Sequence, residues 1–405
     1  MASATSGKIT VVFDADYKAQ HPILVGGVDL HLIVQQLTSA PLVGRSVGLP
    51  KAVYDLANQV FDAIADFSGR GLPQFLAVTI ADRFFECFWP FWRSLSSLGF
   101  QLAASELWKQ LLQCTIDWES KHAVKIHKGT PFFWLGESLI YQADIDTAFL
   151  FIFNAIEQDK SWSQTVGQPD KYKQSPAYKT ATINDSKENT LYEIAVRPVR
   201  DLVSSHATDF SKSTGLVFSL NDFQSNFLDR PDLEKVVFFF VYNVYNHVQR
   251  NRFKQAPLFF ENDFSKLRNL DSIFNMCLVI EEILQHKYAR IRTNYYISDG
   301  VLDLAAANAW IPTGKTREET EKQFFSKLTG VDLRLDPSAT VPVILSGKIT
   351  YDGGPLRPEL RYLLLAWHLR NYGGHNVRAQ DILVQSYDRI FEWLMFALFV
   401  SIVCK

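Results

Sequence analysis

Several features are scarce in this chain of 405 residues, and each shortage argues against a class of protein. The four cysteines are scattered and form no CxxC pair, which disfavours both a zinc site and a disulfide framework and favours buried free thiols. Lysine and arginine (41) nearly balance aspartate and glutamate (43), so the chain has no global attraction for nucleic acid or anionic membranes. Any nucleic-acid site is therefore expected to be a local patch.

Long hydrophobic runs are missing as well. Residues 1–8 are small and polar and contain no apolar core segment, so we expect no signal peptide. The most apolar segment, residues 390–403, is too short to span a bilayer and is interrupted by Glu392. We interpret it as a core or dimer-interface helix. A cytoplasmic protein without membrane contact is then expected by elimination.

Apolar side chains are nonetheless abundant, at 47% of the residues, which is enough for packed cores. Residues 8–13 alternate between apolar and polar positions and predict a short strand. Helical spacing follows over residues 52–67 and 102–116, and residues 75–92 predict a buried helix that Pro90 ends or kinks. These patterns predict a mainly α fold with a short β element, an N-terminal helical region over residues 1–165, and two or three domains in all.

Residues 128–159 predict a helical hairpin, with apolar stripes on both helices and a turn at Ala143-Asp144. This unit resembles a tetratricopeptide-type unit, and a generic αα-hairpin is the alternative, because no second copy occurs at a period near 34. We expect the N-terminal region to sense a trigger or to bind a protein partner. Residues 166–200 are largely polar and predict a linker.

The C-terminal half, residues 201–405, predicts four principal helices and a mixed insertion. The helices are expected at residues 233–248, 264–288, 358–372 and 379–403. The insertion covers about residues 289–357. Within it we expect a helix near residues 317–328 and strand-like runs at 341–345 (VPVIL) and 348–351 (KITY).

The main candidate site lies at the end of the third of these helices, where Arg370, Asn371 and His375 form the motif R-N-x3-H. With the surrounding helices of residues 215–405, including Ile280-Glu281-Glu282, this motif resembles the HEPN family of helical-bundle ribonucleases and nucleotide-binding domains. The resemblance implies a four-helix bundle in which two motifs commonly meet across a dimer interface. Because the chain has one such motif, a composite site requires a homodimer.

RNA cleavage without a metal needs a base, an acid and a cation near the scissile phosphate. His375 is the candidate base or acid, Arg370 the phosphate-holding cation, and Asn371 a group that orients one of them. Positions five apart diverge by about 140° on a regular helix. A break at Gly373-Gly374, or a facing motif in a dimer, would bring the two side chains together. The hypothesis is a metal-independent endoribonuclease for single-stranded RNA that needs no cofactor, and the resemblance suggests antiviral defence or a toxin–antitoxin pair.

Other interpretations remain open. Arg370 and His375 are also typical of helix C-termini, where cations interact favourably with the helix dipole. A non-catalytic interaction scaffold would place Arg370 in a structural salt bridge, and a nucleotide-binding domain would use the same groove.

Cations also gather after the first of these four helices, at Arg250, Arg252 and Lys254. They predict either an RNA-binding rim or a solvated helix end. His122 and His127 are five apart, which disfavours a metal pair, and we expect both to face solvent.

Overall fold

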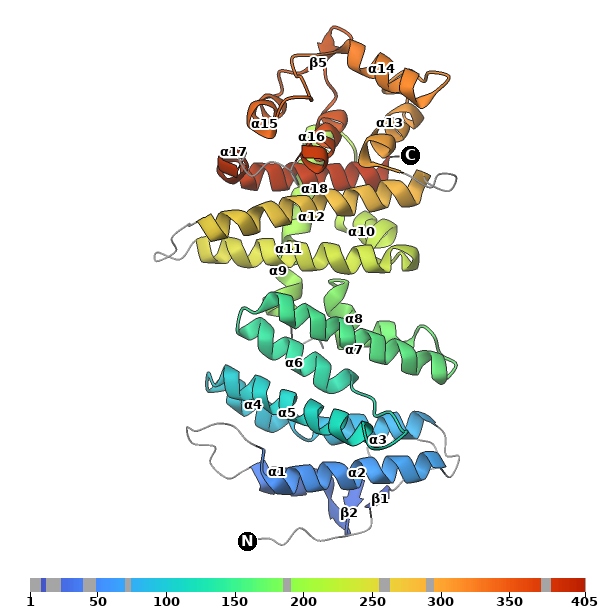
Figure 1. Cartoon of the computed structure of the whole chain (residues 1–405), viewed down its shortest axis with the longest axis vertical. Coiled ribbons are helices and arrows are strands. Elements are labelled where there is room, and N and C mark those ends of the chain that lie inside the picture. Colours follow the sequence, from blue (N-terminus) through green and yellow to red (C-terminus); the bar gives the residue numbers. More distant parts are fainter. Residues whose placement is uncertain are drawn as a thin grey trace. The chain divides into compact units, whose positions relative to one another are not determined.

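The computed structural model describes residues 9–11, 23–38, 49–69, 74–184, 191–254, 263–288, 295–372 and 380–404. They belong to two compact units (Figure 1). Unit 1 comprises Met1–Ala181 and Ser186–Leu191, and unit 2 comprises Thr182–Asp185 and Tyr192–Lys405. Both units are mainly helical with one small antiparallel sheet each, which confirms the expected fold class.

Unit 1 begins with a three-stranded sheet in which β2 pairs with both β1 and β3. Its strands are β1 (Ile9–Val11), β2 (Ile23–Val25) and β3 (Val28–Asp29). The helices that follow are α1 (Leu30–Thr38), α2 (Lys51–Gly69), α3 (Gln74–Glu86), α4 (Trp89–Ser97), α5 (Gln101–Glu119), α6 (Gly129–Tyr141), α7 (Ile145–Thr165) and α8 (Pro176–Ala181). The strand, the helices and the break near Pro90 agree with the sequence patterns.

The hairpin predicted at residues 128–159 is formed by α6 and α7, which pack along each other. Ala143 adopts the left-handed conformation (φ 61°) in the turn, and Asp144 caps α7 by accepting a hydrogen bond from the backbone N–H of Thr147 at 3.3 Å. Gly136 lets the helices approach closely, since a Cβ atom there would lie 2.8 Å from Cγ1 of Ile152. A small residue and two turn residues thus set the geometry of this pair.

The polar linker expected at residues 166–200 is instead partly helical. It contains a 3-10 turn at Lys171–Gln174, α8, a π-helical turn at Tyr192–Val196 and the start of α9 (Arg197–Thr214). Tyr172 and Tyr178 are buried here, with ring centroids 5.2 Å apart, and this segment packs against α7. The composition of this segment is largely polar, and it did not reveal that two of its tyrosine side chains are buried.

Unit 2 contains the remaining helices and the second small sheet. They are α10 (Leu220–Phe223), α11 (Glu234–Lys254), α12 (Asp263–Tyr288), α13 (Ile297–Ala307), α14 (Arg317–Lys327), β4 (Leu328–Thr329), α15 (Pro337–Ser346), β5 (Thr350–Tyr351), β6 (Gly354–Pro355), α16 (Pro358–Tyr372), α17 (Gln380–Gln385) and α18 (Tyr387–Val403), with short turns at Gln224–Leu228 and Pro231–Leu233. The four principal helices of the sequence prediction correspond to α11, α12, α16 and α17–α18.

Helix α12 is the centre of unit 2, because α11, α13, α16 and α18 all pack against it. Figure 1 shows α11, α12 and α18 as neighbouring, nearly parallel rods. Every residue of α18 from Trp393 to Ser401 is buried, so this apolar segment is a core helix, one of the two placements expected for it. Lys287 of α12 donates to the carbonyl of Ser401 at 3.2 Å, which satisfies an orphan acceptor at the end of α18.

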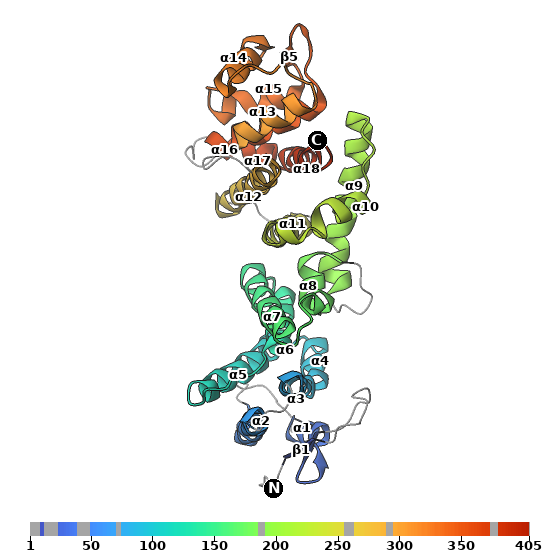
Figure 2. The same cartoon turned by 90° about the vertical axis from the view of Figure 1, so that its right-hand side faces the viewer.

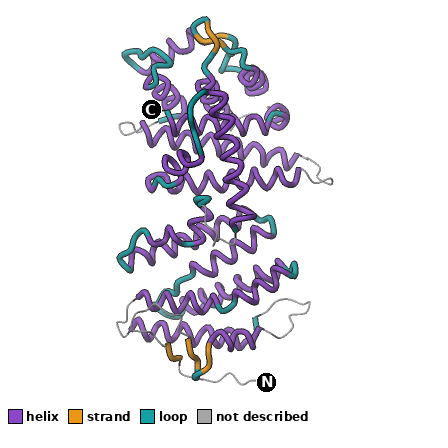
Figure 3. The backbone as a smooth tube through the Cα atoms, turned by 180° about the vertical axis from the view of Figure 1, so that it is seen from behind, coloured by secondary structure: helices purple, strands orange, loops and turns teal. Residues whose placement is uncertain are grey.

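The insertion differs in part from its prediction. Helix α14 forms where expected, and the KITY run contributes β5, but the VPVIL run lies in α15 rather than in a strand. Asp336 caps α15 by accepting from the N–H groups of Ser338 and Ala339, and Gly347 ends it in the left-handed conformation (φ 73°). These caps outweigh the strand preference of valine and isoleucine. Figures 2 and 3 show α13, α14, α15 and the second sheet gathered beside α16.

Among the described helices, none combines the length and the apolar character needed to cross a membrane.

Candidate functional site

Arg370 lies in the last turn of α16 and is tied to α12. Its Nε donates to Oε2 of Glu281 at 2.6 Å, the length of a strong charge-assisted hydrogen bond. The side chain of Arg370 is 40% exposed, whereas that of Glu281 is 12% exposed. The carboxylate thus holds the guanidinium at the edge of unit 2. A salt bridge at Arg370 is what the scaffold interpretation expects, and Glu281 belongs to the segment that carried the family resemblance.

Asn371 follows directly and faces a different direction. Consecutive helical residues are turned by about 100°, so Arg370 faces α12 while Asn371 lines a groove on a neighbouring side of α16. His375, Gly373 and Gly374 lie outside the described residues. The meeting of Arg370 and His375, within one chain or across a dimer, therefore stays a prediction.

Of the three cations predicted to form an RNA-binding rim, the structure describes the side chain of Arg250. Arg250 lies over the ring of Tyr387, 3.6 Å from its centroid, and its terminal nitrogens are buried. This cation would have to leave Tyr387 to reach a phosphate. The side chains of Arg252 and Lys254, at the end of α11, lie outside the described part, so their role as RNA contacts stays a prediction.

The groove beside Asn371 has a volume of about 690 Å³ and belongs wholly to unit 2. Three segments form its walls: α14, the chain from Leu328 to Arg334, and the last turns of α16. It is lined by Glu321, Lys322, Phe325, Ser326, Leu328, Val331, Asp332, Leu333, Arg334, Trp367, His368 and Asn371. The groove falls in the range of about 300–1,000 Å³ that is typical of small-molecule sites.

His368 forms the buried part of this groove. Its Nε2 contacts the hydroxyl of Thr340. Burial lowers its pKa to about 4, although the carboxylate of Asp336 and the backbone of Leu333 act in the opposite direction. The imidazole is therefore neutral at neutral pH and adds no charge to the groove.

Unit 1 contains a separate polar cluster around His127, which corrects the expectation that this residue faces solvent. Its side chain is 7% exposed, with Nδ1 2.9 Å from Asp82 of α3 and Nε2 3.1 Å from Asp159 of α7. Burial lowers the pKa of His127, but the two carboxylates outweigh it and raise the pKa to about 9. The ring is thus a charged link between helices. His122, in contrast, is exposed and stacks on Trp118.

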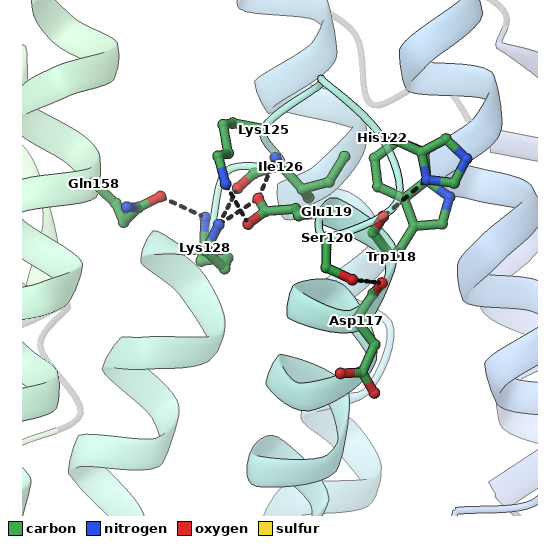
Figure 4. A network of polar contacts seen from close by, with 9 residues as sticks. All are labelled: Asp117, Trp118, Glu119, Ser120, His122, Lys125, Ile126, Lys128 and Gln158. Atoms are coloured by element: carbon green, nitrogen blue, oxygen red, sulfur yellow. Dashed lines mark hydrogen bonds and ion pairs between the residues drawn. The ribbon is translucent and has the colours of Figure 1, made fainter.

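The loop that carries His127 is held by a second buried network (Figure 4). Glu119 accepts from Nζ of Lys128 at 2.5 Å and from the backbone N–H of Ile126 at 2.7 Å. The backbone N–H of Lys128 also donates to Gln158 at 3.3 Å. These bonds position the loop between α5 and α6, and with it His127. The network has no counterpart among the sequence motifs, although only Gln158 is distant in sequence from its partner, at 30 positions from Lys128.

The comparisons with known proteins give no match among protein-family models, curated proteins or solved structures.

Proposed function

We propose that unit 2 is an HEPN-like ribonuclease domain and that the chain acts as a metal-independent endoribonuclease on single-stranded RNA. One observation supports the proposal most strongly: Glu281 holds a partly exposed Arg370 in the last turn of α16, next to a groove lined by Asn371. A guanidinium has five N–H donors, and the ion pair with Glu281 is made through Nε. The terminal nitrogens form the face that suits two phosphate oxygens.

The chemistry assigned to the motif is internal transesterification. A base removes the proton of the ribose 2′-OH, the 2′-oxygen forms a bond to phosphorus, and the bond from phosphorus to the 5′-oxygen breaks. An acid protonates the leaving 5′-oxygen, which yields a 2′,3′-cyclic phosphate. Arg370 would offset the charge that grows on the phosphate oxygens. In a homodimer, His375 and its symmetry mate would supply the base and the acid.

The test is a cleavage assay on labelled single-stranded RNA in EDTA. We expect wild type to release products ending in 2′,3′-cyclic phosphate. R370A should lower the rate by about 10²–10³-fold, and H375A by about 10²–10⁴-fold. R197A is the matched control, because Arg197, the first residue of α9, forms an exposed ion pair with Glu193. No cleavage by folded wild type, or equal rates in all four proteins, would contradict the proposal.

A non-catalytic scaffold is the second candidate, and the Arg370–Glu281 ion pair favours it, since a structural salt bridge needs no substrate. In this case R370A and E281A should each lower stability, wild type should leave RNA intact, and the α6–α7 hairpin and unit 2 should act as protein-binding surfaces. The nuclease hypothesis instead expects R370K to remain folded and to cleave slowly. Lysine keeps the positive charge but lacks the planar guanidinium that can bind two phosphate oxygens at once. A role in antiviral defence or in a toxin–antitoxin pair is carried over from the resemblance.

A further inference from the structure

The groove between α14 and α16 combines an exposed aromatic ring with polar side chains. Phe325 is 36% exposed, and its ring centroid lies 5.4 Å from that of the nearly buried Trp367. A phenylalanine that keeps a third of its surface in solvent and packs at a tilt of 52° against a larger ring is a platform for another planar group. This platform belongs to the insertion, so it is an addition to the four principal helices.

The polar lining is suited to a neutral, hydrogen-bonding partner. Its charges balance, because Lys322 and Arg334 are matched by Glu321 and Asp332. Arg334 is further tied to Asp332, with Nε 2.9 Å and Nη2 3.0 Å from the two carboxylate oxygens. The groove therefore has no net charge to attract a phosphate.

Two neutral groups of α16 line the same groove. Asn371 is exposed, and its side-chain amide both donates and accepts hydrogen bonds, a pattern that matches the edge of a nucleobase. His368, neutral at neutral pH, lies deeper in the same groove. Phosphate binding is assigned to Arg370. This residue directly precedes Asn371, but its side chain is held on the side of α16 that faces α12.

We propose that this groove binds the unpaired base of a nucleotide, which stacks on Phe325 and is read by Asn371. The inference rests on the proposed function, since it assigns the groove to the RNA substrate of that site: a base held here would position its chain near Arg370. Bases splayed out of single-stranded RNA are commonly bound by such aromatic stacking combined with hydrogen bonds to the base edge.

The proposal is tested by equilibrium binding of AMP, CMP, GMP, UMP and 2′-O-methyl hexanucleotides, which resist cleavage because their 2′-oxygens are blocked. We expect F325A to weaken the preferred probe by about tenfold, as expected for loss of one stacked base. F325Y should bind like wild type because it keeps the ring. F100A is the matched control, because Phe100 is an exposed phenylalanine of unit 1. Circular dichroism would establish that each variant is folded.

The probes also identify the source of the base. Tighter binding of a hexanucleotide than of every mononucleotide would identify RNA as the occupant, whereas tighter binding of a mononucleotide would identify a free nucleotide. Replacing the bound base by an abasic residue should reproduce the loss seen in F325A. Unchanged affinity of folded F325A for all probes, or equal losses in F325A and F100A, would overturn the inference.

The cleavage assay separates this inference from the proposed function. If wild type cleaves RNA and R370A does not, while F325A retains the wild-type affinity and KM, the groove assignment fails and the nuclease proposal stands. If wild type leaves RNA intact but base binding depends on Phe325, the nuclease proposal fails and the groove remains a nucleotide site.

Discussion

His127 illustrates how single residues of this chain acquire their properties from partners distant in sequence. Asp82 and Asp159 belong to α3 and α7, and they bind the two nitrogens of one buried imidazole. Because a buried histidine is otherwise neutral, the two carboxylates account for the raised pKa of about 9. The same helices contribute buried apolar faces, so the charged ring connects helices that already pack within unit 1.

This arrangement predicts that unit 1 loses stability in alkaline solution. The folded-state pKa of about 9 exceeds the ordinary 6.5, so the contribution is complete below about pH 6.5 and disappears as the pH rises through 9. A shift of this size corresponds to about 3 kcal/mol, from about 1.4 kcal/mol per pKa unit. Urea unfolding at pH 6 and pH 9.5 should show a larger loss for wild type than for H127Q. H122Q is the control, since His122 is exposed; equal pH dependence in wild type and H127Q would contradict the assignment.

At the scale of elements, capping and close packing decided what propensity alone did not. The VPVIL run became helical because Asp336 and Gly347 define both ends of α15 and its apolar residues are buried. The α6–α7 pair depends in the same way on Gly136. A Cβ atom at this position would lie 3.0 Å from the carbonyl oxygen of Ala148 and 2.8 Å from Ile152.

We therefore expect G136A to destabilise unit 1. Overpacking of a tight contact costs about 1–3 kcal/mol, which outweighs the gain of up to about 1 kcal/mol from replacing a helical glycine by alanine. Gly69, at the end of α2, provides the control, because a Cβ atom there meets nothing within 4 Å. Urea unfolding should show a lower midpoint for G136A and an unchanged or higher midpoint for G69A. A midpoint for G136A at or above wild type would show that α6 and α7 can separate without cost.

At the scale of the whole molecule, each unit has its own buried core, and the chain carries one R-N-x3-H motif. The proposed nuclease therefore requires a second copy of the chain, because one histidine cannot serve as base and acid in the same step. Light scattering should give twice the chain mass of 46.2 kDa.

Subunit mixing tests the composite site directly. A heterodimer of wild type and H375A keeps only one of the two histidines and should therefore be inactive. Reannealing equal amounts of the two proteins should lower the activity to roughly a quarter of that of the same total amount of wild type, because only dimers of two wild-type subunits keep both the base and the acid. Wild type reannealed with R197A is the control, and it should keep full activity. A monomeric wild type that cleaves RNA, or a mixture with H375A that keeps half of the activity or more, would contradict a site built from two subunits.

The sequence by itself determined most of the long helices, because the periodicity of apolar residues and the capping residues act over a few neighbouring positions. It predicted the α6–α7 hairpin, α12, α16 beginning at Pro358, and the buried closing helix α18. It also singled out Arg370 and Asn371 as candidates. Tertiary structure alone decided what these residues face: Glu281 is 89 positions from Arg370, and Phe325 reaches Trp367 across the insertion. Such contacts arise from packing between distant segments, and no local pattern encodes them.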